Sequence, residues 1–135
     1  MHLDRLAAVL ADRLSAIVPD GFHVAAADGM LWYSAEQGRF PGQSGDYRIG
    51  RAGTYVRDNF GVYGASDEAN VIGVAVQALD ELQDYVSEAT HEPWPGTTSQ
   101  PRSHGRILNS HLNLWYGDHD NVILACEPIP LTDFV

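Results

Sequence analysis

The 135-residue sequence contains no lysine and only one cysteine, Cys126. A single cysteine excludes an internal disulfide, and its place in the apolar run Val122–Cys126 predicts packing in the core rather than a reactive thiolate. The lack of an internal disulfide is typical of a protein of the reducing cytoplasm, where we expect this chain to reside. Arginine as the sole basic residue, together with abundant alanine, indicates a GC-rich bacterial genome.

Long hydrophobic runs are also missing. No segment approaches the length of a membrane span, and Asp4, Arg5, Asp12 and Arg13 interrupt the apolar pattern at the N-terminus, where a signal peptide would be unbroken. We therefore expect neither a membrane segment nor a leader.

Positive charge is scarce, because 8 basic residues stand against 18 acidic ones and give a net charge of -10. A field of this sign repels nucleic acid and anionic lipid. It favours either plain solubility or a cationic partner. We expect no nucleic-acid partner and no membrane partner.

Motifs for catalysis or cofactor binding are absent from the sequence. No glycine-rich run has the spacing of a phosphate loop, no serine lies in a nucleophile elbow, and no HExxH pattern occurs. The run Asp118, His119 and Asp120, with His111 upstream, offers oxygen and nitrogen ligands for a divalent metal. Adjacent residues rarely point at one ion and turns favour aspartate, so we interpret them as turn residues. We expect no cofactor, and the sequence favours a non-enzymatic protein.

The segment Asp67–Glu92 has the clearest helical pattern in the chain. Its apolar residues recur at steps of three and four: Ile72, Ala75, Leu79, Leu82, Val86 and Ala89. Ser66 or Asp67 is a suitable N-cap, and Pro93 ends the helix. So wide an apolar stripe predicts a helix that covers a sheet.

The N-terminal third predicts a second helix and a hairpin. Leu3–Val18 has the spacing of an amphipathic helix. Phe22–Asp28 and Met30–Ala35 flank an Asp-Gly pair, which is a strong hairpin signal. The following Glu36–Asp46 predicts a surface loop, and Tyr47–Gly64 predicts one or two strands centred on Tyr55 and Val56.

The C-terminal third predicts a proline-rich connector and a second hairpin. Pro93–Gly105 should be irregular, Arg106–Gly117 and Asn121–Leu131 should pair, and Asp118–Asp120 should form the tip. The unbroken apolar run Val122–Cys126 predicts a central strand covered on both faces. Residues 1–135 thus predict a single α+β domain, an antiparallel sheet of about five strands with two main helices packed on it, in the order α-β-β-(β)-α-β-β.

Two surface features are candidates for partner binding. Asp80, Glu81, Asp84 and Glu88 lie on the outward face of the long predicted helix without a basic residue among them, as either a solvated surface or a site for a basic segment. Trp94, between Pro93 and Pro95, either packs on the domain or remains exposed for recognition. In the second case, Trp94→Ala should weaken partner binding and leave thermal stability nearly unchanged.

The order of helix, strand meander, helix and hairpin in a small acidic domain resembles the architecture of type III secretion chaperones. The resemblance is one of topology and covers most of the chain, although no closing helix follows the last predicted strand. It implies a homodimeric, non-enzymatic binder that wraps an unfolded segment of its partner.

We interpret the chain as a non-enzymatic, chaperone- or adaptor-like module that binds another protein carrying a basic segment. Two alternatives stay open. One is a small enzyme, metal-binding or small-molecule-binding domain with a pocket between sheet and helix, using His111, Asp118, His119 or Asp120. The other is an immunity-type inhibitor whose acidic surface neutralises a basic toxin.

Overall fold

The computed structural model describes residues 1–41, 51–96 and 98–135. Its two main helices are α1 (Leu3–Ser15) and α3 (Asp67–Thr90), and one short helix, α2 (Val56–Asn59), precedes α3. The strands are β1 (Phe22–Ala27), β2 (Met30–Ala35), β3 (Arg51–Tyr55), β4 (Ser103–Leu108), β5 (His111–Asp118), β6 (Asn121–Ala125) and β7 (Ile129–Pro130), followed by a 3-10 turn, η1 (Leu131–Asp133). The predicted loop at Glu36–Asp46 and the predicted strand region at Tyr47–Gly64 both extend into residues 42–50, which lie outside the described residues.

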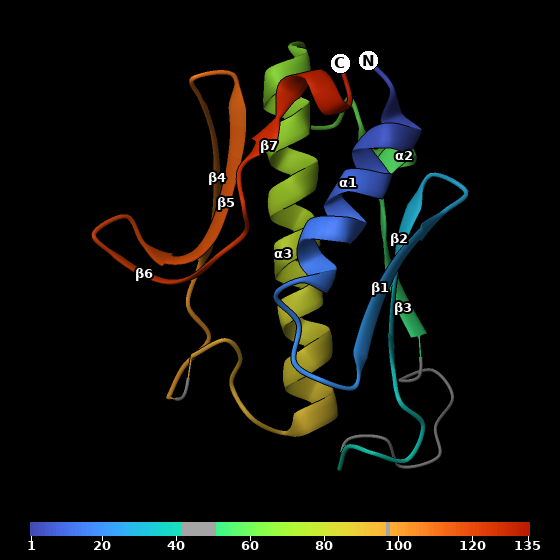
Figure 1. The fold of residues 1–135 in the computed structure, drawn as a ribbon, viewed down its shortest axis with the longest axis vertical. Helices are drawn as coiled ribbons and strands as arrows, with labels where there is room; N and C mark the ends of the chain where they lie inside the picture. The colour runs from blue at the N-terminus through green and yellow to red at the C-terminus, as the bar shows by residue number, and fades with distance from the viewer. Residues whose placement is uncertain (42–50, 97) are drawn as a thin grey trace.

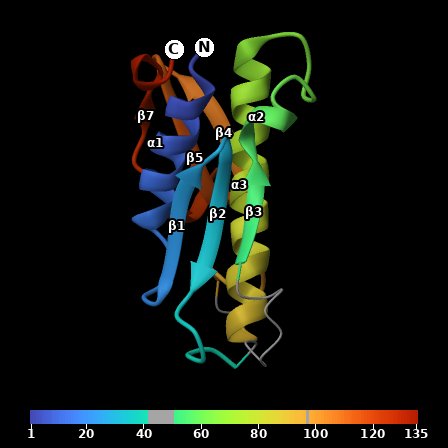
Figure 2. The same cartoon turned by 90° about the vertical axis from the view of Figure 1, so that its right-hand side faces the viewer.

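The described strands form two antiparallel sheets, with α1 and α3 side by side between them (Figures 1 and 2). The first sheet has the order β1-β2-β3. In the second sheet, the order is β4-β5-β6, with β7 also paired to β5. The predicted α+β class, with two main helices packed on antiparallel strands, is confirmed. The strands are divided between two sheets instead of forming one, because α3 buries side chains against both.

Helix α3 owes its central place to its wide apolar surface. Its buried residues extend around more than one face of the helix: Val71, Val74, Ala75, Ala78, Leu79, Leu82, Tyr85, Val86 and Ala89. Ser66 is the N-cap, and its side chain accepts a hydrogen bond from the backbone N–H of Ala69, as the sequence predicts. An apolar surface this wide needs cover on two sides of the helix.

One buried tyrosine from each sheet bonds to the backbone of α3. The hydroxyl of Tyr33 on β2 donates to the carbonyl of Ala78 at 3.2 Å and shares a 2.6 Å hydrogen bond with the Thr54 hydroxyl. The hydroxyl of Tyr116 on β5 donates to the carbonyl of Leu79 at 2.7 Å. Adjacent carbonyls of one helix turn therefore anchor both sheets.

The segment between α2 and α3 is fixed by Asn70, a buried residue of the first turns of α3. The Asn70 side-chain oxygen accepts from the backbone N–H of Gly61 at 2.6 Å and of Tyr63 at 3.1 Å, and its amide donates to the carbonyls of Gly64 and Ser66. Val56 was predicted as part of a strand centre, and that prediction is wrong, because the residue begins α2 and is buried there.

The C-terminal hairpin begins earlier than predicted. The predicted single strand Arg106–Gly117 is two strands, β4 and β5, joined by a turn in which Asn109 and Ser110 have φ values of 52° and 62°. Asparagine tolerates this left-handed region better than most residues, and the turn lets Ser103–Gly105, predicted as connector, begin β4.

Strand β6 is exposed, contrary to the prediction that Val122–Cys126 forms a central strand covered on both faces. Val122 is 49% exposed and Ile123 is 46% exposed, and β6 pairs only with β5 among the described strands. The hairpin tip at Asp118–Asp120 is confirmed, as is the burial of Cys126. The apolar run is therefore an edge strand with few residues directed inward.

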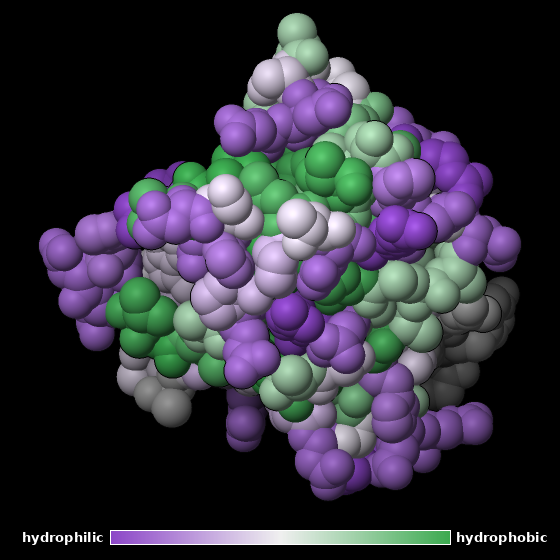
Figure 3. Space-filling view, turned by 45° about the horizontal axis from the view of Figure 1, so that its top comes forward, coloured by the Kyte–Doolittle hydropathy of each residue, from purple (hydrophilic) through white to green (hydrophobic). Residues whose placement is uncertain are grey.

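The two termini meet at one end of the molecule. The backbone N–H of His2 donates to the carbonyl of Phe134 at 2.9 Å, which ties the start of the chain to its end. Seen with this end turned forward, apolar and polar residues are interspersed over the surface (Figure 3).

Candidate functional site

The side of α3 turned away from α1 is exposed between the edges of the two sheets (Figure 2). Helix α3 contacts β3 on one side of this strip and β4 on the other. Asp80, Asp84 and Glu88 are exposed along it, and Glu81 is half-buried. We call these four carboxylates, together with Tyr63, the acidic flank.

The N-terminal half of this strip is apolar and hollowed. Tyr63 lies over Gly73, where an added Cβ would come within 2.1 Å of the tyrosine ring, so only glycine admits the aromatic side chain. The Tyr63 hydroxyl donates to the side-chain oxygen of Gln77 at 2.5 Å. Tyr63, Ile72 and Val76 line a hollow of about 380 Å³ that ends at Asp80. The strip therefore passes from an apolar hollow to a row of acids.

The acidic flank is not neutralised from within the described part of the chain. Within that described part, the arginines that form ion pairs do so away from the flank: Arg13 with Asp12, Arg39 with Asp20 and Glu36, and Arg57 with Asp4. On the flank, Asp80 accepts a hydrogen bond from the Ser103 hydroxyl of β4. Asp84 and Glu88 have no ion pair among the described residues.

Glu81 differs from its neighbours in its surroundings. Burial raises the pKa of the Glu81 carboxyl above its usual range, hydrogen bonds with Gln77 and Thr54 oppose that shift, and the charges of Asp80 and Asp84 add to it. The same neighbourhood acts on Tyr63, because burial and then the charges of Glu81 and Asp80 raise the pKa of its phenol. The carboxylates therefore repel one another, and a cation placed here would relieve that repulsion.

Trp94 adopts the packed arrangement of the two that the sequence left open. Its ring is partly buried against the core and meets Tyr116 edge-on, with 5.4 Å between ring centroids. Trp94 is thus partly packed on the domain, and its role in partner binding stays a prediction. Tyr63, which is 39% exposed, is the aromatic residue beside the acids.

Replacement of Trp94 by alanine is expected to lower the free energy of unfolding by about 1–3 kcal/mol, since the edge contact with buried Tyr116 is lost. This reverses the expectation that the change leaves stability nearly unaltered. Chemical denaturation measures the loss, and Tyr55→Ala, at a 53% exposed aromatic, is the matched control. A Trp94 variant as stable as the control would contradict the packing argument.

The residues considered as metal ligands are not brought together. His111 begins β5 and its Nδ1 contacts the carbonyl of Asn109 at 2.8 Å, whereas Asp118 ends the same strand. His119 and Asp120 are exposed at the hairpin tip, with 3.4 Å between Nδ1 and the carboxylate. Across residues 1–41, 51–96 and 98–135, no group of three metal-binding side chains converges.

Comparison with protein-family models, with curated proteins and with solved structures finds no match to this chain. The resemblance to type III secretion chaperones thus stays a prediction. None of the described helices combines the length and hydropathy required to cross a membrane.

Sequence analysis missed the residues that shape the acidic flank. Asn70 sits within the apolar stripe of the helix, and Gly73 interrupts it one turn later. A buried-side asparagine and a glycine inside an otherwise strong helix are signals of a close approach by another segment. Tyr63 carries no such signal, because its position depends on the hydrogen bonds that Asn70 makes to the preceding loop.

Proposed function

We propose that this protein is a non-enzymatic protein-binding module whose acidic flank binds a partner segment that is basic and partly apolar. The observation that carries the proposal is the exposed strip of α3, where a hollow of about 380 Å³ adjoins carboxylates without an ion-pair partner among the described residues.

The chemistry of the strip defines the partner. An apolar side chain fits the hollow beside Tyr63, and lysine or arginine side chains one or two helical turns further along fit Asp84 and Glu88. Opposite charges across an interface speed encounter and set the register of binding. The apolar contact supplies affinity that does not depend on salt.

Affinity capture from a lysate of the source organism tests this proposal. We expect the immobilised protein to retain one stoichiometric partner at about 0.1 M salt and to release most of it at about 1 M salt, where the Debye length falls from about 10 Å to about 3 Å. The variant Asp84→Asn/Glu88→Gln should lose the partner, since it removes two charges of the flank without changing side-chain size.

The matched control is Asp118→Asn/Glu127→Gln, which removes two exposed charges on or beside the second sheet, outside the flank, and leaves the same net charge. It should retain the partner. Equal retention by both double variants would show that the flank is not the binding surface, and beads that hold no specific protein at either salt concentration would count against a binding module.

A further inference from the structure

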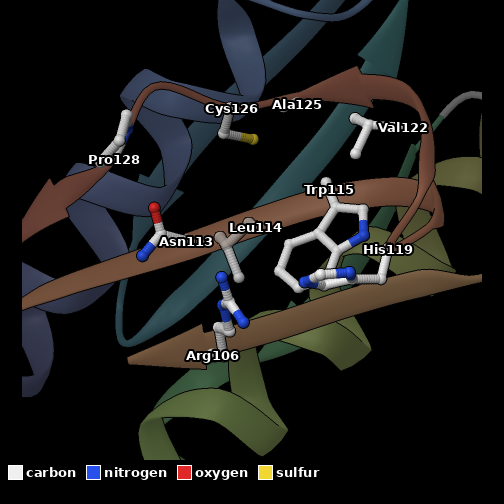
Figure 4. Close-up of a pocket in the computed structure, with 9 residues that line it drawn as sticks. All are labelled: Arg106, Asn113, Leu114, Trp115, His119, Val122, Ala125, Cys126 and Pro128. Atoms are coloured by element: carbon white, nitrogen blue, oxygen red, sulfur yellow. The ribbon is translucent and has the colours of Figure 1, made fainter. Parts of the chain in front are cut away.

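A second surface feature lies on the outer face of the second sheet, away from α3. There β5 and the edge strand β6 line an open cavity of about 350 Å³, whose lining side chains are shown in Figure 4. None of its lining residues is acidic, and one of them, Arg106, is basic. In a chain with a net charge of -10, such a lining is a local departure from the overall field.

Trp115 forms an aromatic wall of this cavity. The ring of His104 stacks on its indole with 5.4 Å between centroids and 23° between ring planes, and the Arg106 guanidinium lies 6.0 Å from the indole centroid. His104 and Arg106 are two residues apart on β4 and therefore point to the same face of the sheet. His104 pairs with Trp115 on β5, so both side chains project from the outer face beside Trp115. The result is a planar, electron-rich surface with a cation next to it.

Hydrogen-bonding capacity around Trp115 is unused. Its indole Nε1 is buried and has no hydrogen-bond partner among the described residues, and the same holds for Nε2 of His104. Indole N–H is a donor only, so an acceptor is what this position lacks. Arg106 forms no ion pair with any described residue, and its guanidinium offers five further donor hydrogens. Asn113 lines the cavity beside it.

We propose that this cavity binds a small planar monoanion, an aromatic carboxylate, with its ring on Trp115 and its carboxylate on Arg106. The volume lies at the small end of the usual range for ligand sites, which suits one or two fused rings. A guanidinium pairs with a carboxylate through two parallel hydrogen bonds. One arginine in a strongly acidic protein matches one negative charge and disfavours polyanions such as nucleic acid.

The test uses benzoate and 2-naphthoate as probes, with the uncharged 2-naphthamide for comparison. The three tryptophans give three indole N–H resonances in NMR spectra, and Trp115→Phe identifies the one that belongs to Trp115. We expect a saturable shift of that resonance on addition of 2-naphthoate, and affinity for 2-naphthoate at least tenfold above that for 2-naphthamide.

Arg106→Gln should abolish this tenfold preference, because it removes the cation while keeping a side chain that can donate. Arg102→Gln is the matched control, since Arg102 is exposed on the preceding segment and does not line the cavity. Unshifted Trp32 and Trp94 resonances report that each variant is folded. The proposal is overturned if neither carboxylate shifts the Trp115 resonance at millimolar concentration, or if the preference survives in Arg106→Gln. Because the acidic flank takes no part, either result leaves the proposed protein-binding function to its own test.

Discussion

Tyr116→Ala is expected to lower the free energy of unfolding by about 3–5 kcal/mol, the range for removal of a fully buried aromatic side chain. Tyr116 is inaccessible to solvent, contacts Trp94 and donates its hydroxyl to the carbonyl of Leu79. The change therefore removes core volume and also the anchor of the second sheet on α3.

Denaturant titration of the wild type and of two variants separates these contributions. Tyr116→Phe keeps the ring and loses one hydrogen bond, so we expect it to cost about 1 kcal/mol. The Leu79 carbonyl lies within the helix, where a backbone N–H remains to bond it, which limits that loss. A Tyr116→Ala variant less than about 1 kcal/mol below the wild type would show that β5 is not packed on α3 as described.

Alkaline pH is expected to destabilise the protein steeply above about pH 10. Burial raises the pKa values of the Tyr33 and Tyr116 phenols well above their usual range, and burial raises the pKa of the Cys126 thiol to about 11. These groups ionise more easily in the unfolded chain, so the unfolded state holds fewer protons at high pH. Their stabilising effect is complete below the unfolded pKa values and is lost as pH rises.

The size of the effect follows from the number of protons held. Each such group lowers the free energy of unfolding by about 1.4 kcal/mol per pH unit above its unfolded pKa, so Cys126 acts from about pH 8.5–9 and both tyrosines act from about pH 10. Between about pH 10 and 11 the three together give a slope of roughly 3 kcal/mol per pH unit, because unfolded tyrosines are only half ionised at pH 10 and Cys126 also loses its proton in the folded state near pH 11.

Denaturant titrations at pH values from 8 to 11 measure this slope. Tyr116→Phe should reduce it by about 1 kcal/mol per pH unit between about pH 10 and 11, and Cys126→Ala should remove the part that begins below that range. Tyrosinate absorbance gives a second readout, since Tyr33 and Tyr116 should ionise only as the protein unfolds. A stability that stays level to pH 11 in the wild type would contradict the burial of these groups.

The helices and the first hairpin could be predicted because their signals are local. Ser66 as the N-cap, the apolar spacing of the central helix, and the Asp28-Gly29 turn each act within a few residues. Asp28 and Gly29 both have positive φ, as a tight hairpin turn of this kind requires. The burial of Cys126 could also be predicted, because free cysteine is a residue type that is often buried and its neighbours in the sequence are apolar.

The division of the strands could not be predicted from such signals. The apolar run Val122–Cys126 has the composition of a covered central strand, yet β6 lies at an edge where Val122 and Ile123 face solvent. The amino-acid composition of a strand shows how apolar the strand is. Its burial depends on which elements, distant in the sequence, pack against it. Trp94 is a similar case, since its burial depends on Tyr116, a residue on another element.

The sequence by itself determined the α+β class, the extents of the two main helices to within a few residues, the hairpin tips at Asp28-Gly29 and Asp118–Asp120, and the acidic character of α3. Local hydrogen bonds and side-chain periodicity suffice for these features. Only the tertiary structure decided that α3 lies between two sheets, that Tyr63 covers Gly73 beside the acids, and that Arg106 meets Trp115 on an outer face. Each of these depends on contacts between residues distant in the chain, and the free energy of such contacts is set by packing rather than by local pattern.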